Sequence, residues 1–579
     1  MEAKLNASES HNWLARTSFF LRSKGLQAQR LVHDSLRRLP LLRPGVIEDY
    51  PYVLAESISD LRTASDPREQ PLILGKIQNL RVACRSLHAR ALAPDEIFSL
   101  WRQIGPPWPV RGFVPGREVR EGCVIPTFGG GLCQLSGSLH EVALAAGFDV
   151  LERHRHTALP QDVPRLPQRD ATLFWNYVDL RFRSPVPALI ECFLTESTLV
   201  LRVRGKAPGA APQLRLVEIG ETGARATRIE SCVTCEQADC SRHVEVKFNG
   251  GKAAFLLEDY QPEFARLLAG EIKDGDQLLV PFVSPNGWRE SQTGFRKLRC
   301  PRWFRIRRSA ALRWATFRGL NVAKPYFEFS RVLANLYIRW LDYDAEHVCV
   351  TQNLLPYLWR SGLLGGRTFD VLMQRLPVTF LEGQLNEATR LYPESQTLVE
   401  FRAPRWFAEA EEQALREARA IFTPHTQIAS LYNRASCLPW ETPPHSNGNG
   451  AAKDLILFAG PTLARKGAYA VRDAVRRTGL ALTVVGSDLE GPGFWRELSV
   501  TRVSNREIPW ERVHTVVQPA LVEYWPRQLL KAHAAGANLV ITPLCGIAEN
   551  PSTGIYHVPF GNVDILAATL TQLLTTQET

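Results

Sequence analysis

Short apolar runs recur along the whole chain, and their arrangement changes near residue 310. Before that point, "ATLFWNYVDLRF" and "ALIECFLTESTLVLRVRG" predict β-strands, and "LGKIQNLRVACRSLHAR" predicts a helix. After it, apolar runs such as "HVCVTQNLL", "DLILFAG" and "NLVITPL" alternate with helical segments. This alternation is typical of a parallel, doubly wound sheet. The pattern therefore predicts an α+β domain followed by an α/β, Rossmann-like region of two lobes.

Breaks in this pattern divide the 579 residues into several units, as the length alone suggests. Prolines and a glycine in "LPLLRPG" end an N-terminal helical segment, and "PWETPPHSNGNGAAKD" separates two halves of the Rossmann-like region. We expect these two halves to form lobes that face one another across a cleft. The predicted segments are a basic helical arm (1–45), an α+β domain (46–205), a small irregular β-rich segment with a Cys/His cluster (206–309), a first Rossmann-like lobe (310–440), a linker (441–453) and a second Rossmann-like lobe (454–579).

Composition and charge narrow the setting in which the protein works. An apolar fraction of 45% indicates a folded globular protein, and a net charge of +10, mostly from arginine, suits phosphates or an anionic surface. We expect no nucleic-acid partner. The basic run Arg296–Arg308, with interleaved aromatic residues, is a candidate for peripheral membrane contact or a solvated connector between domains. The N-terminus lacks a signal-peptide core, and the 11 cysteines are mostly scattered singly, so we expect a cytoplasmic protein, with a peripheral position at the inner membrane face left open.

A cysteine follows three glycines and opens a predicted helix in "PTFGGGLCQLSGSLHEVALAAG". Glycine allows a close backbone approach and positive φ, and free amide groups at the helix N-terminus would stabilise a thiolate at Cys133. A nucleophilic thiol also needs a base and an orienting acid, for which His156 and Asp170 are candidates. The pattern predicts a Cys133–His156–Asp170 catalytic site. The alternative is a simple tight turn beside surface histidines.

A second cluster of chemically capable residues lies in "SCVTCEQADCSRH". It spaces Cys232, Cys235, Cys240 and His243 as Cys-x2-Cys-x4-Cys-x2-His. Two close pairs of such ligands can complete a tetrahedron around zinc, which would stabilise a segment too small for its own core. The spacing predicts a structural zinc site, with an iron–sulfur cluster or no metal as alternatives.

The glycine–cysteine motif resembles the VanW family, together with an Arg-x-x-His after the helix and an Asp-Ala-Thr strand. The resemblance runs from about Ile77 to Phe193 and makes residues 46–205 a VanW-like domain. It implies a cell-envelope context but no settled reaction. The matching positions are Gly129, Gly130, Gly131, Cys133, Gln134, Arg153, His156, Asp170, Ala171 and Thr172.

The second Rossmann-like lobe carries cations at the mouth of a predicted strand. In "LILFAGPTLARKGAYAVRDAVR", a loop after the strand contains Gly460 and then Arg465 and Lys466 before a helix. Fixed cations at that place are suited to a diphosphate, because they neutralise the charge of a phosphate leaving group. A later loop, in "VQPALVEYWPRQLL", carries Glu523.

These stretches, from about Asp454 to Leu574, resemble the nucleotide-sugar lobe of retaining two-Rossmann glycosyltransferases of the GT-B type. The resemblance implies that the first lobe serves the acceptor. The family often has a second glutamate eight residues after the first, which binds ribose hydroxyls, but Lys531 stands at that position here. The matching positions are Gly460, Arg465, Lys466, Gly467, Pro519, Glu523, Ala534 and Gly536.

Three functional hypotheses follow from these motifs. The first is transfer of a sugar from a nucleotide-sugar donor to an envelope or surface glycan, or to a lipid-linked acceptor, with donor contacts from Gly460, Arg465, Lys466 and Glu523. The second is a thiol-dependent amidase or acyl transferase at Cys133. The third is a non-catalytic scaffold that binds glycan or peptide and carries a degenerate glycosyltransferase lobe.

Overall fold

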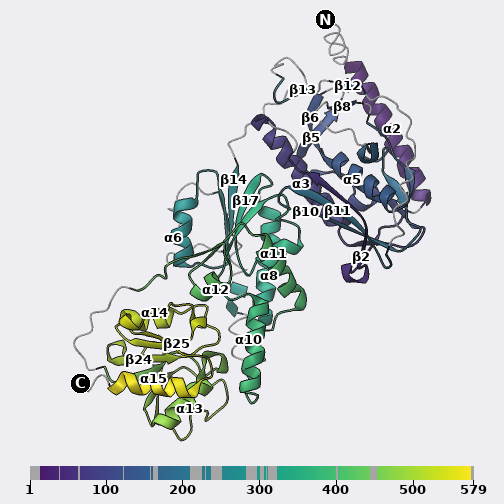
Figure 1. Cartoon of the computed structure of the whole chain (residues 1–579). Helices are drawn as coiled ribbons and strands as arrows, with labels where there is room; N and C mark the ends of the chain where they lie inside the picture. The colour runs from purple at the N-terminus through teal and green to yellow at the C-terminus, as the bar shows by residue number, and fades with distance from the viewer. Residues whose placement is uncertain are drawn as a thin grey trace. The chain divides into compact units, whose positions relative to one another are not determined.

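The computed structural model describes most of the chain, and the chain divides into two units (Figure 1). Unit 1 comprises residues 1–252, 342–346 and 361–367, and unit 2 comprises residues 253–341, 347–360 and 368–579. The described residues are 13–37, 39–62, 66–120, 123–156, 158–160, 167–208, 225–227, 230–235, 251–281, 296–299, 306–307, 309–310, 323–399, 402–443 and 453–575.

Unit 1 is built on a five-stranded antiparallel sheet of order β1-β3-β10-β11-β2. Two helices, α3 and α5, pack against it with their apolar faces and form one core with the inward residues of β10 and β11 (Figure 1). The antiparallel sheet with helices confirms the α+β prediction. The strands are β1 (Arg43–Pro44), β2 (Tyr52–Asp60), β3 (Arg90–Leu92), β10 (Ala188–Leu194) and β11 (Thr198–Gly205), and the helices are α2 (Trp13–Arg37), α3 (Gln70–Leu87) and α5 (Leu132–Ala145).

Smaller sheets of unit 1 include the strands that lead into α5. The hairpin of β5 (Pro115–Arg120) and β6 (Cys123–Phe128) ends one residue before the triple glycine, and α5 begins directly after it. Smaller sheets have the orders β13-β6-β5, β4-β9-β7 and β12-β8. Their remaining strands are β4 (Ile97–Ser99), β7 (Asp149–Glu152), β8 (Ala158–Pro160), β9 (Arg181–Arg183), β12 (Arg225–Thr227) and β13 (Glu230–Ser231).

The first lobe of unit 2 is a seven-stranded sheet of order β16-β15-β14-β17-β18-β19-β20. It begins at Lys252 rather than near residue 310, because two short runs of the segment predicted as small, irregular and β-rich, "KAAFL" and "QLLV", are its strands β14 and β15. The strands are β14 (Lys252–Leu256), β15 (Gln277–Val280), β16 (Arg296–Arg299), β17 (Ala345–Thr351), β18 (Thr368–Leu372), β19 (Ala420–Thr423) and β20 (Ala435–Cys437). Its helices are α6 (Pro262–Glu271), α8 (Ala323–Trp340), α9 (Leu355–Arg360), α10 (Val378–Leu391), α11 (Arg405–Glu417) and α12 (Thr426–Ser430).

The second lobe is a six-stranded parallel sheet of order β23-β22-β21-β24-β25-β26. Helices α13 and α15 cover one face and α14 covers the other, with a separate apolar core on each side (Figure 1). The elements are β21 (Leu455–Phe458), α13 (Ala468–Thr478), β22 (Leu482–Val485), β23 (Val500–Val503), β24 (Val513–Gln518), α14 (Arg527–Ala534), β25 (Asn538–Ile541), β26 (Ile555–His557) and α15 (Val563–Thr575).

Both lobes have the strand order of a Rossmann fold. Numbered within each lobe, the sheets run 3-2-1-4-5-6, and the first lobe adds a seventh strand at one edge. In such sheets, ligands bind where the strand order reverses, at the carboxyl ends of the strands. The prediction of two Rossmann-like lobes is confirmed, and it directs attention to the loops that follow β21 and β24.

The two lobes of unit 2 contact each other through buried carboxylates. Glu490 accepts a hydrogen bond from Ser395 Oγ of the first lobe at 2.9 Å and one from Ala464 N of the second lobe at 2.7 Å. Glu263 of α6 forms an ion pair of 2.6 Å with Arg527 of α14, and its side chain is fully buried. These charged contacts join the two lobes of unit 2.

None of the helices in the described ranges combines the length and the apolar composition needed to span a bilayer. Four residues of the predicted membrane-contact run Arg296–Arg308, namely 296–299, form β16 at the edge of the first sheet. Most of the run lies outside the described residues.

Candidate functional sites

The triple glycine makes a turn that fits closely against β5 and α3. A Cβ on Gly130 would lie 2.2 Å from the carbonyl oxygen of Gly116, and Gly131 has φ +97°. Asn79 of α3 is fully buried, and its Nδ2 donates a hydrogen bond of 2.9 Å to the Gly130 carbonyl. Side chains at these glycines would collide with the neighbouring backbone or require a strained φ. The glycines therefore allow α5 to begin at a fixed place.

Cys133 lies in the first turn of α5, where the amide groups of the helix are unsatisfied by intrahelical bonds. The thiol is partly exposed, and its Sγ is 3.9 Å from Thr172 Oγ1. The apolar residues Leu135 and Leu139 are fully buried beneath it and fix the helix in the core. The thiol is therefore held on a rigid element and remains accessible from solvent.

His156 contacts both Asp170 and Cys133. Its Nδ1 lies 2.7 Å from Asp170 Oδ1, and its backbone N–H donates to the same oxygen at 3.0 Å. Burial lowers the pKa of His156, but the hydrogen bonds with Asp170 and with Cys133 outweigh it and raise that pKa to about 10. Burial would raise the pKa of Asp170, and the contacts with His156 reverse this and lower it. The structure thus brings together the three side chains that the sequence pattern proposed.

Other positions of the motif hold this arrangement in place. Arg153 Nε donates a hydrogen bond of 2.8 Å to the Asp170 carbonyl oxygen, and the Thr172 N–H donates one of 2.9 Å to the His154 carbonyl oxygen. Gln134 Nε2 donates to the Asp60 carbonyl at 2.8 Å, which ties α5 to β2. These residues position the catalytic candidates and do not themselves form the Cys133–His156–Asp170 contacts.

One buried cation near the turn was not anticipated from the sequence. Lys76 of α3 is 5% exposed, and its side chain lies against Gly131, where a Cβ would be 2.3 Å from Lys76 Cγ. Burial, assisted by the charge of Arg117, lowers the pKa of Lys76 to about 7. In the sequence, only its spacing of three residues from Asn79 on one helix could have suggested a shared role at the turn.

Half of the predicted zinc ligands can be placed. Cys232 is buried, and Cys235 Sγ lies 3.9 Å from the Cys232 carbonyl oxygen, whereas Cys240 and His243 lie outside the described residues. Among the residues that the structure does describe, no group of three or more metal-binding side chains is arranged to hold a metal ion. The four-ligand zinc site therefore stays a prediction.

A pocket in the second lobe of unit 2 lies at the point where the strand order reverses. Its volume is about 200 Å³, and it opens between the loops after β21, β22 and β24. Ligand pockets usually measure about 300–1,000 Å³, so this one would enclose part of a nucleotide sugar rather than the whole molecule. Its lining residues are Ala459, Gly460, Pro461, Lys466, Val485, Gly486, Asn505, Glu523, Trp525, Pro526, Gln528 and Leu529.

An ion pair between Lys466 and Glu523 closes one wall of this pocket. Glu523 also accepts hydrogen bonds from Gln518 Nε2 at 2.7 Å and from the backbone N–H of Trp525 at 3.2 Å. Glu523 is only 8% exposed, and the three donors, Lys466, Gln518 and the Trp525 N–H, fix the orientation of its carboxylate. Lysine and carboxylate together offer a cation for phosphate and an acceptor for hydroxyl groups.

Lys466 is the last residue of the short 3₁₀ helix η6 (Ala464–Lys466), and Gly467 caps this helix. Gly467 has φ +87°, and a Cβ there would lie 2.4 Å from the Pro519 carbonyl oxygen. Arg465 is absent from the pocket lining. Its carbonyl oxygen instead accepts hydrogen bonds from the backbone N–H groups of Leu521 and Val522, so Arg465 braces the loop that carries Glu523.

The structure also shows where the departure from the glycosyltransferase pattern lies. Lys531 Nζ sits 5.1 Å from the ring centroid of Trp510, in a cation–π contact, and Lys531 is absent from the pocket lining. One turn earlier in α14, Gln528 lines the pocket. The wall therefore carries a neutral amide, Gln528, next to the position where the family pattern has its second carboxylate.

Comparison with known proteins agrees with a VanW-like region in unit 1. Residues 75–204 match the family model described as VanW like protein. Over 106 residues, the chain is 29% identical to the uncharacterized protein YoaR of Bacillus subtilis, which covers 18% of this chain and 34% of YoaR. Over 148 residues, it is 26% identical to the vancomycin B-type resistance protein VanW of Enterococcus faecalis, which covers 25% of this chain and 54% of that protein. The chain thus spans a third to about half of the length of these relatives.

Solved structures similar to this chain include a sucrose-phosphate synthase from Thermosynechococcus elongatus. The likeness has a TM-score of 0.35 and 12% sequence identity, and it covers 56% of this chain and 90% of the synthase. The Rossmann character of the two lobes is established by their own strand order.

Proposed function

We propose that the protein is a glycosyltransferase that takes a sugar from a nucleotide-sugar donor and transfers it to an envelope or surface glycan, or to a lipid-linked acceptor. The observation that carries this proposal is the Lys466–Glu523 ion pair in a pocket at the strand-order reversal of a Rossmann lobe. Sites of that kind favour phosphorylated ligands because strand ends and helix starts direct free amide groups toward them.

The roles of the two charged residues follow from their chemistry. Lys466 would neutralise the charge that develops on the nucleoside diphosphate as the glycosidic bond to it breaks. Glu523, with its three donors in place, would accept hydrogen bonds from donor hydroxyl groups. In this scheme, charge stabilisation at the diphosphate comes from this chain's own cation.

Calorimetry with a panel of nucleotide sugars tests this proposal. Wild-type protein should bind at least one donor, and Lys466→Ala should weaken that binding about tenfold or more, because it removes a charge-assisted contact. Arg496→Ala is the matched control, because Arg496 is an exposed cation of the same lobe that does not line the pocket. If no donor binds wild-type protein, the non-catalytic scaffold is favoured instead.

We infer a second activity for unit 1, thiol-dependent acyl transfer, because His156 contacts both Cys133 and Asp170. In this reaction, Cys133 Sγ attacks an amide carbonyl carbon, and the carbon–nitrogen bond breaks. His156 gives its proton to the leaving nitrogen, which leaves an acyl thioester on Cys133. Water or an acceptor amine then releases the acyl group and regenerates the thiol.

Alkylation by iodoacetamide at neutral pH tests this second activity without a known substrate. Cys133 should react about tenfold faster than Cys123, a partly exposed cysteine at the start of β6 in the same unit. Mass spectrometry of peptides identifies the labelled residue. Equal labelling of the two thiols would remove the assignment.

Cytoplasmic location belongs to the same proposal. The 11 cysteines are mostly scattered singly along the sequence, which is typical of a protein in a reducing compartment. A peripheral position at the inner membrane face would bring the transferase to an envelope acceptor.

A further inference from the structure

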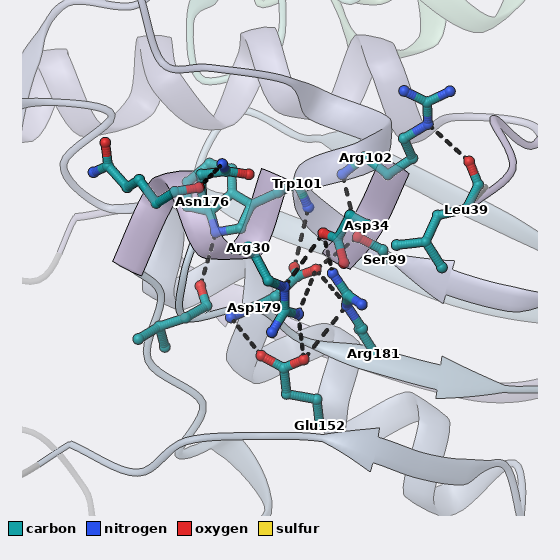
Figure 2. A network of polar contacts seen from close by, with 12 residues as sticks. Arg30, Asp34, Leu39, Ser99, Trp101, Arg102, Glu152, Asn176, Asp179 and Arg181 are labelled. Carbon is teal, nitrogen blue, oxygen red and sulfur yellow. Dashed lines mark hydrogen bonds and ion pairs between the residues drawn. The ribbon is translucent and has the colours of Figure 1, made fainter. Parts of the chain in front are cut away.

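Helix α2 packs against unit 1 with its polar side. Arg30 forms an ion pair with Glu152, and Asp34 Oδ2 accepts from Arg181 at 2.6 Å (Figure 2). Ser23, about two turns before Arg30 on the same side, is 7% exposed. The polar side chains, which on an amphipathic helix usually face water, here contact the rest of unit 1.

Along residues 21–32, the opposite side of the helix is apolar and exposed to solvent. Leu21 and Val32 are 66% and 63% exposed, and Ala28 lies between them. At about 100° per residue, these three side chains fall within about 40° of one another and lie opposite Arg30. Leu31, at 57% exposure, lies about 80° from Leu21 and widens the same surface. An amphipathic helix in a soluble protein normally buries such a stripe.

The charges on α2 indicate what covers this stripe. Arg22 and Lys24 are exposed beside it, and Asp34 is the single acidic residue in the sequence of the helix, where it is engaged by Arg181. Apolar residues flanked by cations are the composition of helices that lie in the interface of an anionic bilayer. A second copy of this helix would bring like charges together.

We propose that the outward face of α2, formed by Leu21, Leu31 and Val32 with Arg22 and Lys24, binds the surface of a membrane that contains anionic lipid. The Arg30–Glu152 and Asp34–Arg181 contacts hold the helix in this orientation. The surface is independent of the pocket in unit 2, so membrane binding and donor binding are separate properties.

Vesicle flotation with the full chain tests the proposal. Wild-type protein should float with vesicles of phosphatidylcholine and phosphatidylglycerol, remain behind with phosphatidylcholine alone, and detach as salt screens the cations. The double variant Leu21→Glu/Val32→Glu should lose this binding by about tenfold or more, because it places acids in the apolar stripe. The control is Val110→Glu/Val186→Glu, which changes two exposed valines of unit 1 outside α2 and should float like wild-type protein.

Several outcomes would overturn the proposal. One is wild-type protein that stays behind with anionic vesicles, and another is a double variant that still floats. A third is self-association, measured by light scattering, that the double variant abolishes, which would assign the face to a second copy. Circular dichroism confirms that the variants are folded. Nucleotide-sugar calorimetry on the same variants should be unchanged, so failure of membrane binding can be told apart from failure of the transferase proposal.

Discussion

Asp170 receives two hydrogen bonds from His156, one from the imidazole Nδ1 at 2.7 Å and one from the backbone N–H at 3.0 Å. The carboxylate can only accept, so Nδ1 carries a proton and the other ring nitrogen is left for Cys133. Asp170 therefore fixes both the position and the protonation pattern of the imidazole.

Replacing Asp170 with asparagine should slow the reaction of Cys133. The neutral amide stabilises an imidazolium less well than the carboxylate, so the pKa of His156 should fall from about 10 toward its usual value. We expect alkylation of Cys133 at neutral pH to slow by about tenfold or more. The control is Asp149→Asn, which changes an exposed aspartate of β7 that pairs with Arg183. An alkylation rate equal to that of wild-type protein would show that Asp170 has no part in activating the thiol.

The same site should make stability depend on pH in a defined direction. The folded-state pKa of His156 is raised from 6.5 to about 10, so protonated His156 favours the folded state. Its contribution is fully present below pH 6.5 and is lost as pH rises through about 10. The difference in the free energy of unfolding between wild-type protein and His156→Gln should therefore shrink over that range. Urea unfolding at a series of pH values measures it, and a difference that stays constant would contradict the assignment.

The glycine turn before Cys133 offers a test with a well-matched control. Gly131→Ala would combine φ +97° with a Cβ only 2.3 Å from Lys76 Cγ, whereas Gly147→Ala would have φ +73° in open space. Both substitutions introduce backbone strain of about 1–2 kcal/mol, but only the first also displaces a buried side chain. We expect Gly131→Ala to lower the free energy of unfolding more than Gly147→Ala and to slow alkylation of Cys133. Equal effects would mean that the turn tolerates a side chain.

Glu523→Gln should separate sugar recognition from diphosphate recognition in the second lobe. In the proposed donor site, the change would weaken hydrogen bonds to donor hydroxyls and would release Lys466 from its ion pair. Calorimetry should show about tenfold weaker binding of the nucleotide sugar, with no loss for the nucleoside diphosphate alone. Glu507→Gln, at an exposed glutamate that accepts from Ser504, serves as the control. A parallel loss for both ligands would assign Glu523 to positioning Lys466 instead.

The sequence predicted those features that depend on local pattern. The triple glycine, the helix after Cys133 and the alternation of strands and helices in the lobes all leave periodic or positional signals. Cys133, His156 and Asp170 could be grouped because the VanW-like motif carries all three. Lys466 and Glu523 could be grouped because parallel strands direct their following loops to one edge of the sheet.

Features set by contacts between distant segments were not predictable. The sequence positions of β14 and β17 are far apart, so their membership of one sheet leaves no local trace. The same holds for Asn79 of α3, which donates a hydrogen bond to the Gly130 carbonyl in the turn before α5. The orientation of α2 is a further example, because an apolar stripe on a helix is normally buried, whereas the ion pairs of Arg30 and Asp34 hold the helix with Leu21 and Val32 exposed.

Those ion pairs can be tested through Arg181, which bonds Asp34 at 2.6 Å and Asp179 at 3.0 Å. Asp179 is almost completely buried, and burial raises its pKa despite the hydrogen bonds it accepts. Arg181→Met would remove the closer of the two cations that these carboxylates share, the other being Arg30. We therefore expect a loss of stability toward the lower end of about 3–5 kcal/mol and faster hydrogen exchange in α2. Arg183→Met, two residues along the same strand, removes an exposed pair with Asp149 and should cost far less stability, because solvent screens that pair. If Arg181→Met leaves hydrogen exchange in α2 unchanged, Arg181 does not hold the helix in place.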